Sequence, residues 1–193
     1  MSTLYKTAKI KEYSKENLTK YERSLHPELF SYAMSAKEGE PRARRLAAME
    51  ALFLCLRELG EEGARITETP YGKPYFFGSP LHFSLSHAGG LAAACVSSAR
   101  CGIDLEPYEP PVTPERIARI SARFSPAVRE AIAAAPDPAR AFTQEWVKRE
   151  ARSKCDGRGL GVLYLLDADG EGAECHRLLV DGREYFLAVY CEK

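Results

Sequence analysis

The sequence predicts an α+β fold, in which helices and antiparallel strands occupy separate runs of the chain. A long amphipathic helix pattern covers residues 41–59. Short strand-like runs elsewhere are joined by glycine-containing turns that suit hairpins. Three further helices are each predicted to start at a capping residue that is followed by proline. Each half of the 193-residue chain therefore contains helices and candidate antiparallel strands.

The first half has one strongly predicted helix. Residues 1–40 carry only weak patterns. A helix then opens at Pro41 and ends at Leu59, because Pro suits the first turn and Gly60 suits the end. Its apolar stripe consists of Leu46, Met49, Leu52, Phe53 and Leu56.

A turn-rich stretch covers residues 69–80 and leads into two strand candidates. These strands span residues 82–86 and 91–97, and Ala88-Gly89-Gly90 separates them. The close spacing predicts an antiparallel pair.

The second half begins with a predicted strand at residues 102–106, which the prolines that follow it end. The three helix starts are Thr113-Pro114, Ser125-Pro126 and Asp137-Pro138. The last of these helices should run to about Lys154. Three strand-like runs follow, at 160–166, 174–180 and 185–191, with turns at Asp169-Gly170 and Asp181-Gly182.

Composition limits the class of protein. Lysine plus arginine equals aspartate plus glutamate, so the net charge is zero and does not favour a nucleic-acid partner. The six cysteines are scattered without metal-ligand spacing, so they predict neither a disulfide framework nor a zinc site. No apolar run reaches membrane-spanning length, and the lysine-rich first twenty or so residues do not resemble a signal peptide. We expect a reduced, soluble, cytoplasmic protein with no membrane partner.

Two short stretches carry the chemistry. If Ile103 and Leu105 face a core, then Asp104 and Glu106 share the opposite face of their strand, because side chains alternate. Further on, the residues at helical spacing i, i+4, i+8 are Trp146, Glu150 and Lys154. Three carboxylates with flanking cations suit a divalent metal ion bound to a phosphate ester. The plainer alternative is a solvated strand edge and an exposed Glu150–Lys154 pair worth about 0.3–0.5 kcal/mol.

These two stretches, together with three motifs that precede them, match the signature of a known family and occur in the order expected for that family. The motifs are Arg42-Ala43-Arg44-Arg45-Leu46, Tyr71-Gly72-Lys73-Pro74, Ser84-Leu85-Ser86-His87, Gly102-Ile103-Asp104-Leu105-Glu106 and Trp146-Val147-Lys148-Arg149-Glu150-Ala151-Arg152-Ser153-Lys154. Between residues 42 and 160 the chain resembles the 4'-phosphopantetheinyl transferases of the surfactin-synthetase-activating type.

The resemblance implies a fold and an activity. The fold would be two similar α+β halves packed as a pseudo-dimer, with an N-terminal half at residues 1–98 and a C-terminal half at 99–193. The activity would be transfer of 4'-phosphopantetheine from coenzyme A to a serine of an apo acyl or peptidyl carrier protein, with release of 3',5'-ADP. The cofactor would be Mg²⁺ or Mn²⁺, which both accept octahedral oxygen ligands. A monomer would suffice, because the cleft forms within one chain.

The resemblance also assigns roles to residues. The metal ligands would be Asp104, Glu106 and Glu150. The catalytic group would comprise Glu150, Lys154 and Asp104, with Glu150 as a candidate base for the serine hydroxyl. Coenzyme A would contact Arg44, Lys73, Pro74, Ser86, His87, Arg149 and Lys154, where Arg44 holds the 3'-phosphate and Lys73 lies near the adenosine end.

Other residues allow two interpretations. Trp146 is interpreted as a core anchor that holds its helix against the sheet. The arginines at i, i+3 and i+7 of the helix after Pro114 form either a solvated face or a docking stripe for an acidic carrier protein: Arg116, Arg119 and Arg123.

The chain departs from the family pattern at two positions. Arg149 stands where the family usually has lysine, and Val128 stands near where it often has a carboxylate. Both departures leave open the alternative of a catalytically degenerate homologue that binds coenzyme A.

Overall fold

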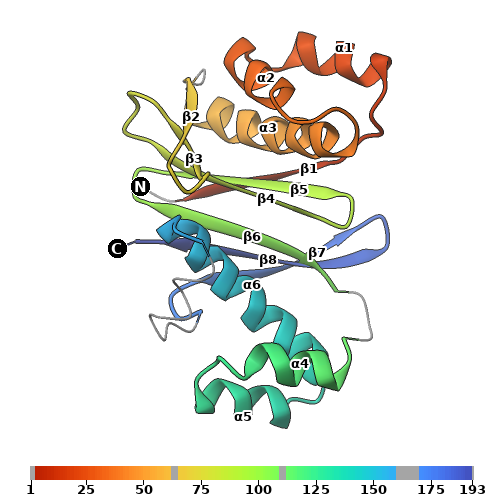
Figure 1. The fold of residues 1–193 in the computed structure, drawn as a ribbon, viewed down its shortest axis with the longest axis vertical. Coiled ribbons are helices and arrows are strands. Elements are labelled where there is room, and N and C mark those ends of the chain that lie inside the picture. Colours follow the sequence, from red (N-terminus) through yellow and green to blue (C-terminus); the bar gives the residue numbers. More distant parts are fainter. Residues whose placement is uncertain (1–2, 62–64, 109–111, 160–169, 193) are drawn as a thin grey trace.

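The computed structural model describes residues 3–61, 65–108, 112–159 and 170–192. The described chain is α+β and its strand pairs are antiparallel, as the sequence predicts. Its strands form a three-stranded sheet in the order β1-β5-β4, a two-stranded hairpin β2-β3, and a three-stranded sheet in the order β6-β8-β7. In Figure 1 the two larger sheets occupy the middle of the molecule, α1–α3 cover the upper one, and α6 lies along the lower one.

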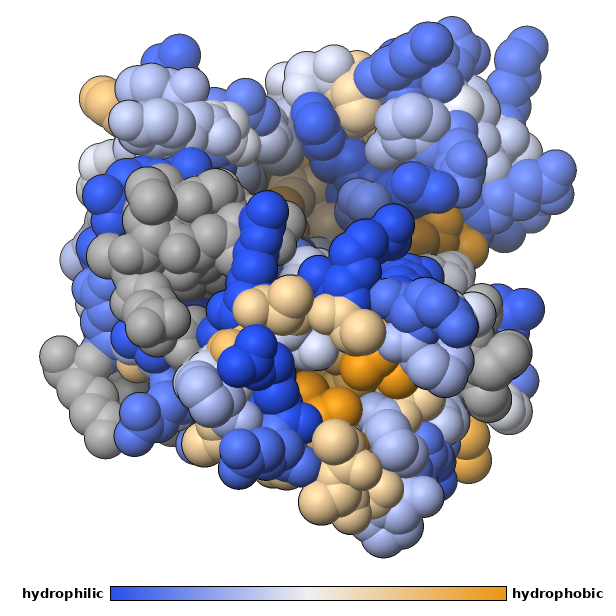
Figure 2. All heavy atoms as spheres, turned by 60° about the horizontal axis from the view of Figure 1, so that its bottom comes forward, coloured by the Kyte–Doolittle hydropathy of each residue, from blue (hydrophilic) through white to orange (hydrophobic). Residues whose placement is uncertain are grey.

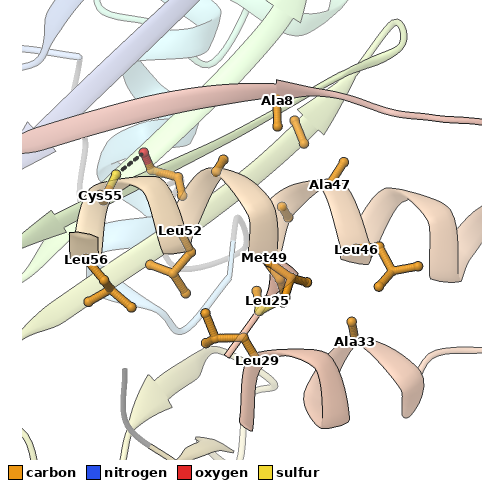
Figure 3. Packing of buried hydrophobic residues seen from close by; sticks show 14 of the residues in the cluster. Ala8, Leu25, Leu29, Ala33, Leu46, Ala47, Met49, Leu52, Cys55 and Leu56 are labelled. Carbon is orange, nitrogen blue, oxygen red and sulfur yellow. Dashed lines mark hydrogen bonds between the residues drawn. The ribbon is translucent and has the colours of Figure 1, made fainter. Parts of the chain in front are cut away.

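Three helices precede the first predicted strand pair. They are α1 (Lys15–Ser24), α2 (Pro27–Met34) and α3 (Glu40–Leu59). The α3 helix confirms the predicted helix, and Gly60 ends it in the left-handed conformation with φ of 74°. Its stripe packs between α2 and the sheet: Figure 3 shows Leu29 beneath α3, while Ala47 points toward Ala8 of β1. This cluster is the largest core of the N-terminal side.

The strand β1 (Leu4–Lys9) was not predicted from the sequence. It pairs along its whole length with β5 (Leu91–Ser97), which lies more than eighty residues later in the chain. Apolar and polar residues alternate only weakly in β1, so its own sequence does not indicate a strand. Its partner β5 is too distant in the chain for the two to be recognised as a hairpin.

The predicted pair of strands is confirmed as β4 (His82–Ala88) and β5, with the turn at Gly89-Gly90. Both glycines have positive φ, of 55° and 91°, which explains why glycine occurs there. The turn-rich stretch before them contains β3 (Pro74–Phe76), and β2 (Ile66–Glu68) directly precedes it.

The C-terminal side follows the predicted order. It contains β6 (Cys101–Pro107), α4 (Pro114–Ser121), α5 (Pro126–Ala134), α6 (Pro138–Asp156), β7 (Glu174–Val180) and β8 (Arg183–Cys191). All three predicted helix starts are confirmed, because the side chains of Thr113, Ser125 and Asp137 each accept a hydrogen bond from a backbone N–H three residues on. The turn Asp181-Gly182 joins β7 to β8. The predicted strand 160–166 and most of the turn near Asp169 lie outside the described residues.

The helix α6 packs on the lower sheet through Val147 and Ala151, which contact Phe186 and Ala188 of β8. The close approach of α6 to β6 requires a glycine at position 102 of β6, because a Cβ there would lie 1.9 Å from the carbonyl oxygen of Ala151 in α6.

Trp146 is only half-buried and packs with Phe124 and Phe142 in a cluster formed by α4, α5 and α6, while its side chain also forms a hydrogen bond with Glu106 of β6. It therefore links α6 to the sheet, as predicted, but it is not a fully buried core residue. Figure 2 brings this end of the molecule forward and shows apolar side chains there among charged ones. Among the described helices, none combines the length and apolar character needed to cross a membrane.

The strands β4 and β6 meet along a seam between the two larger sheets. They are not a backbone-paired ladder. Instead, the hydroxyl oxygens of Ser84 and Ser86 on β4 accept hydrogen bonds from the backbone N–H groups of Ile103 and Leu105 on β6, at 3.1 and 3.2 Å. Side-chain oxygens thus satisfy buried donors at the edge of β6. The candidate site lies on this seam.

Candidate active site

A cavity of about 750 Å³ opens at the seam and collects most of the predicted site residues. Its walls come from α2, α3, β3, β4, β6 and α6. The predicted residues that line it are Arg44, Pro74, Ser86, His87, Asp104, Glu106, Glu150 and Lys154. These side chains come from distant parts of the sequence, so their convergence is a property of the fold.

The predicted alternation on β6 is confirmed. Ile103 and Leu105 are buried in the core between the sheets, while Asp104 and Glu106 line the cavity. Asp104 is not on a solvated edge, because only 4% of it is exposed. The plainer interpretation of this strand as a solvent-facing edge therefore does not hold.

Asp104 is held on one oxygen only. Its Oδ1 accepts hydrogen bonds from Lys154 Nζ at 2.6 Å and from Ser86 Oγ at 2.9 Å. Its Oδ2 is buried and has no hydrogen-bond partner among the described residues. A buried carboxylate oxygen without a donor is costly, so this atom is suited to receive a further positive group.

The helix α6 presents one face to the cavity, as its spacing predicts. Glu150 and Lys154 both line the cavity, and a hydrogen bond from Trp146 reaches Glu106. The three positions at i, i+4 and i+8 therefore share one side of the helix.

The electrostatics show that the three carboxylates repel one another. Burial raises the pKa of Glu150 to about 7, and the negative charges of Asp104 and Glu106 add to this shift while Lys154 opposes it. Burial also raises the pKa of Glu106, with Asp104 as the next cause. Lys154 alone does not balance this negative charge, and a cation at the cavity would lower both values.

The opposite wall is cationic. Arg44 of α3 pairs with Glu40 one turn earlier, and both side chains remain substantially exposed. His87 lies at the end of β4, where partial burial lowers its pKa and the charges of Arg44 and Lys154 lower it further. Arg44 and Arg45 are the arginines on this wall, and their charge favours binding of an anion.

Sequence reasoning missed other residues on this wall. Arg45 lines the cavity next to Arg44, donates to Ser35 Oγ at 3.0 Å, and stacks over the ring of Tyr32. Tyr32 in turn donates to Glu68 at 2.7 Å. The adjacent arginine pair was the only local signal, since Tyr32 and Glu68 come from elements that the sequence did not resolve.

Lys73 does not line this cavity. It borders an adjoining hollow, and its ammonium donates to the backbone carbonyls of Cys155 at 2.9 Å and Cys101 at 3.2 Å. Burial lowers its pKa. In this arrangement Lys73 ties the β2-β3 hairpin to β6 and to the C-terminal end of α6.

Arg149 also lies elsewhere. Only 3% of it is exposed, and its guanidinium lies over the ring of Phe124, 4.2 Å from the centroid. Adjacent residues of a helix diverge by about 100°, so Arg149 cannot share the cavity face of Glu150. Val128 is likewise remote from the cavity and packs against the cluster beneath α4 and α5.

The three arginines of the predicted stripe are exposed, but only Arg116 and Arg119 lie on α4, because the helix ends at Ser121 and Arg123 follows it. Arg116 lies near enough to Glu106 to lower its pKa. The stripe therefore begins beside the carboxylates of the cavity.

Part of the chain that forms this cavity is similar to a known protein superfamily. Residues 100–186 match the model of the 4'-phosphopantetheinyl transferase superfamily. The match includes Asp104, Glu106, Glu150 and Lys154, and it ends within β8. A search of curated proteins finds no match. The region that matches this superfamily thus supplies the wall that carries Asp104, Glu106, Glu150 and Lys154, called here the carboxylate wall, whereas Arg44 and His87 precede it in the chain.

The similarity to this superfamily raises the question of whether the cavity could hold a divalent metal ion. Among the described residues, no group of three or more histidine, cysteine, aspartate or glutamate side chains is arranged to enclose one. The donor chemistry nevertheless fits: the buried Oδ2 of Asp104 lacks a donor, and Glu106 and Glu150 carry raised pKa values that a cation would relieve. Mg²⁺ usually takes one or two carboxylates and completes its shell with water and phosphate oxygens, so a full protein cage is not required.

Proposed function

We propose that this protein transfers 4'-phosphopantetheine from coenzyme A to a serine of an apo acyl or peptidyl carrier protein, in a Mg²⁺-dependent reaction that releases 3',5'-ADP. The observation that carries the proposal is the cavity at the seam. Its carboxylate wall belongs to the region that matches the phosphopantetheinyl transferase superfamily, and its other wall supplies Arg44 and His87.

The charge arrangement suits coenzyme A, which carries a pyrophosphate and a separate 3'-phosphate. We propose that the pyrophosphate binds beside Asp104 and Lys154, and that the 3'-phosphate binds toward Arg44 and His87. Arginine suits this second position because its planar fork donates two hydrogen bonds to one phosphate. A divalent ion held by Asp104, Glu106 and Glu150 would neutralise the pyrophosphate.

The reaction needs no nucleophile from this chain. The carrier's serine oxygen would attack the β-phosphorus, and the bond from that phosphorus to 3',5'-ADP would break. Lys154 would stabilise charge on the departing oxygen, since its ammonium already lies in the cavity. Glu150 lines the same cavity and would accept the serine proton as a general base.

We further propose that residues 1–98 and 99–193 act as two halves that meet at the β4–β6 seam. The walls of the cavity come from both ranges of one chain, so a monomer would suffice. The exposed arginine stripe begins on α4 beside Glu106, and it would steer an acidic carrier so that its serine enters the cavity there.

The test is intact-protein mass spectrometry of purified apo carrier proteins from fatty-acid, polyketide and nonribosomal-peptide systems. Each is incubated with this protein, coenzyme A and Mg²⁺, and a parallel sample contains EDTA. We expect a gain of one phosphopantetheine unit on at least one carrier, lost with EDTA. No gain on any carrier, from protein that still binds coenzyme A, would contradict the proposal.

A further inference from the structure

Ser86 lies where the seam between β4 and β6 adjoins the carboxylates of the cavity. It lies on β4, only 5% of it is exposed, and its hydroxyl contacts three groups. The Oγ atom lies 3.2 Å from the N–H nitrogen of Leu105, 2.8 Å from Lys154 Nζ and 2.9 Å from Asp104 Oδ1. These contacts tie β4 to both β6 and α6.

The directions of these hydrogen bonds follow from the chemistry of the partners. The Leu105 amide and the Lys154 ammonium can only donate, so they occupy the two lone pairs of the hydroxyl. An ionised Asp104 can only accept, so it takes the single hydroxyl hydrogen. Ser86 therefore has no donor left for a phosphate, although the sequence analysis placed it among the contacts to coenzyme A.

The same hydrogen bonds fix the orientation of Asp104. Ser86 and Lys154 both bind Oδ1, which leaves Oδ2 as the oxygen without a partner. Rotation of the carboxylate would break a bond to Ser86, whose own position is fixed by the seam. We infer that Ser86 is a positioning residue that orients Asp104 toward a divalent cation and does not itself contact coenzyme A. This inference rests on the proposed function.

The chain provides a matched control in Ser84. It lies two residues earlier on the same strand, is 4% exposed, and accepts the N–H of Ile103 across the same seam at 3.1 Å. No described hydrogen bond joins it to a carboxylate. Ser84→Ala therefore removes one seam bond of the same kind and leaves the orientation of Asp104 unchanged.

The experiment measures binding directly. Mn²⁺ is titrated into the full-length protein with coenzyme A present, and free Mn²⁺ is followed by electron paramagnetic resonance. Metal-free binding of coenzyme A is measured in EDTA by calorimetry. We expect Ser86→Ala to weaken Mn²⁺ binding about tenfold, because partners that orient a metal ligand typically have effects of this size. Metal-free coenzyme A binding should stay unchanged, and Ser84→Ala should match the unsubstituted protein in both measurements.

Two results would overturn the inference. One is unchanged Mn²⁺ affinity in Ser86→Ala with weaker metal-free binding of coenzyme A, which is the behaviour of a phosphate ligand. The other is an equal loss of Mn²⁺ affinity in Ser84→Ala, which would assign the effect to the seam as a whole. Circular dichroism melts verify folding, and if Ser86→Ala does not fold, Ser86→Cys provides the same comparison with a weaker hydrogen-bonding group. Absence of coenzyme A-dependent Mn²⁺ binding in the unsubstituted protein would overturn the proposed function together with the inference.

Discussion

The two walls of the cavity differ in how firmly they hold their charged groups. On the β6–α6 wall, Asp104 is buried and bonded to both Ser86 and Lys154. On the α3–β4 wall, Arg44 is well exposed and pairs with Glu40 on its own helix. A group that must orient a metal ion needs a fixed position, whereas a group that binds a mobile phosphate can adjust.

Because of this difference, we expect one wall to contribute mainly to catalysis and the other mainly to the binding of coenzyme A. The carboxylate wall should determine whether the reaction occurs, and the cationic wall should determine how tightly coenzyme A binds. Substitutions on the two walls should therefore separate kcat from KM.

Asp104→Ala should have the largest effect on activity. We expect transfer to fall by at least about a thousandfold, because the buried carboxylate that would hold the cation is lost. The fold should remain, since the substitution also removes a negative charge that adds to the effect of burial in raising the pKa of Glu150. Mass spectrometry of a carrier substrate measures the loss, and Asp181→Asn on the exposed β7–β8 turn is the control. Substantial activity in Asp104→Ala would contradict the role of this wall.

Gly102→Ala tests whether the carboxylate wall depends on close packing of α6 against β6. The new Cβ would lie 1.9 Å from the carbonyl oxygen of Ala151 and 2.4 Å from the backbone nitrogen of Cys155. Because these are backbone atoms, the whole of α6 would have to shift to relieve the overlap. We therefore expect the free energy of unfolding to fall by about 3 kcal/mol or more. Chemical denaturation measures it. Gly90→Ala adds only backbone strain in open space, so its cost should be nearer about 1 kcal/mol. Equal effects would show that packing at Gly102 is not critical.

Glu150→Gln tests the cost of burying an ionised Glu150 beside the other two carboxylates. The pKa of Glu150 is raised from 4.5 to about 7, so the folded state binds its proton more tightly than the unfolded state. This carboxyl therefore costs stability progressively as pH rises from about 4.5 to about 7, and the cost persists above that range. In EDTA, Glu150→Gln should gain stability over the unsubstituted protein across this interval, by about 2 kcal/mol after allowance for partial exposure. Denaturation at several pH values measures it, and a difference that does not change with pH would refute the assignment.

Arg44→Ala should have the smallest effect of the four. We expect KM for coenzyme A to rise about tenfold with little change in kcat, because one charged contact to the 3'-phosphate is removed. Steady-state kinetics with dephospho-coenzyme A, which lacks that phosphate, should show no further loss. Arg57→Ala, at the far end of the same helix, is the control. A fall in kcat instead of a rise in KM would contradict the division between the two walls.

Predictions from the sequence were most accurate where one strand or one helix alone determines which side chains lie on the same face. Strand alternation brought Asp104 and Glu106 to one face, and helical spacing brought Glu150 and Lys154 to another. Capping residues followed by proline located the starts of α4, α5 and α6. In each case the relevant contacts lie within a few residues of one another.

Prediction was weaker where packing between elements decides the outcome. Lys73 donates to carbonyls of β6 and α6, Arg149 lies over Phe124, and Trp146 packs against Phe124 and Phe142 instead of entering the core of the sheet. A motif gives the residue type at these positions but not the neighbour that the fold brings to it. The strand β1 was missed for the same reason, because β5 is its distant partner.

Calorimetric titration of coenzyme A into the protein, with Mg²⁺ and separately with EDTA, tests the central claim most directly. The claim is that coenzyme A and a divalent cation bind together in the cavity at the seam. We expect Mg²⁺ to strengthen binding at least about tenfold in the unsubstituted protein and to have no such effect in Asp104→Ala. Coenzyme A affinity that is the same with Mg²⁺ and with EDTA, or a Mg²⁺ effect that persists in Asp104→Ala, would contradict it.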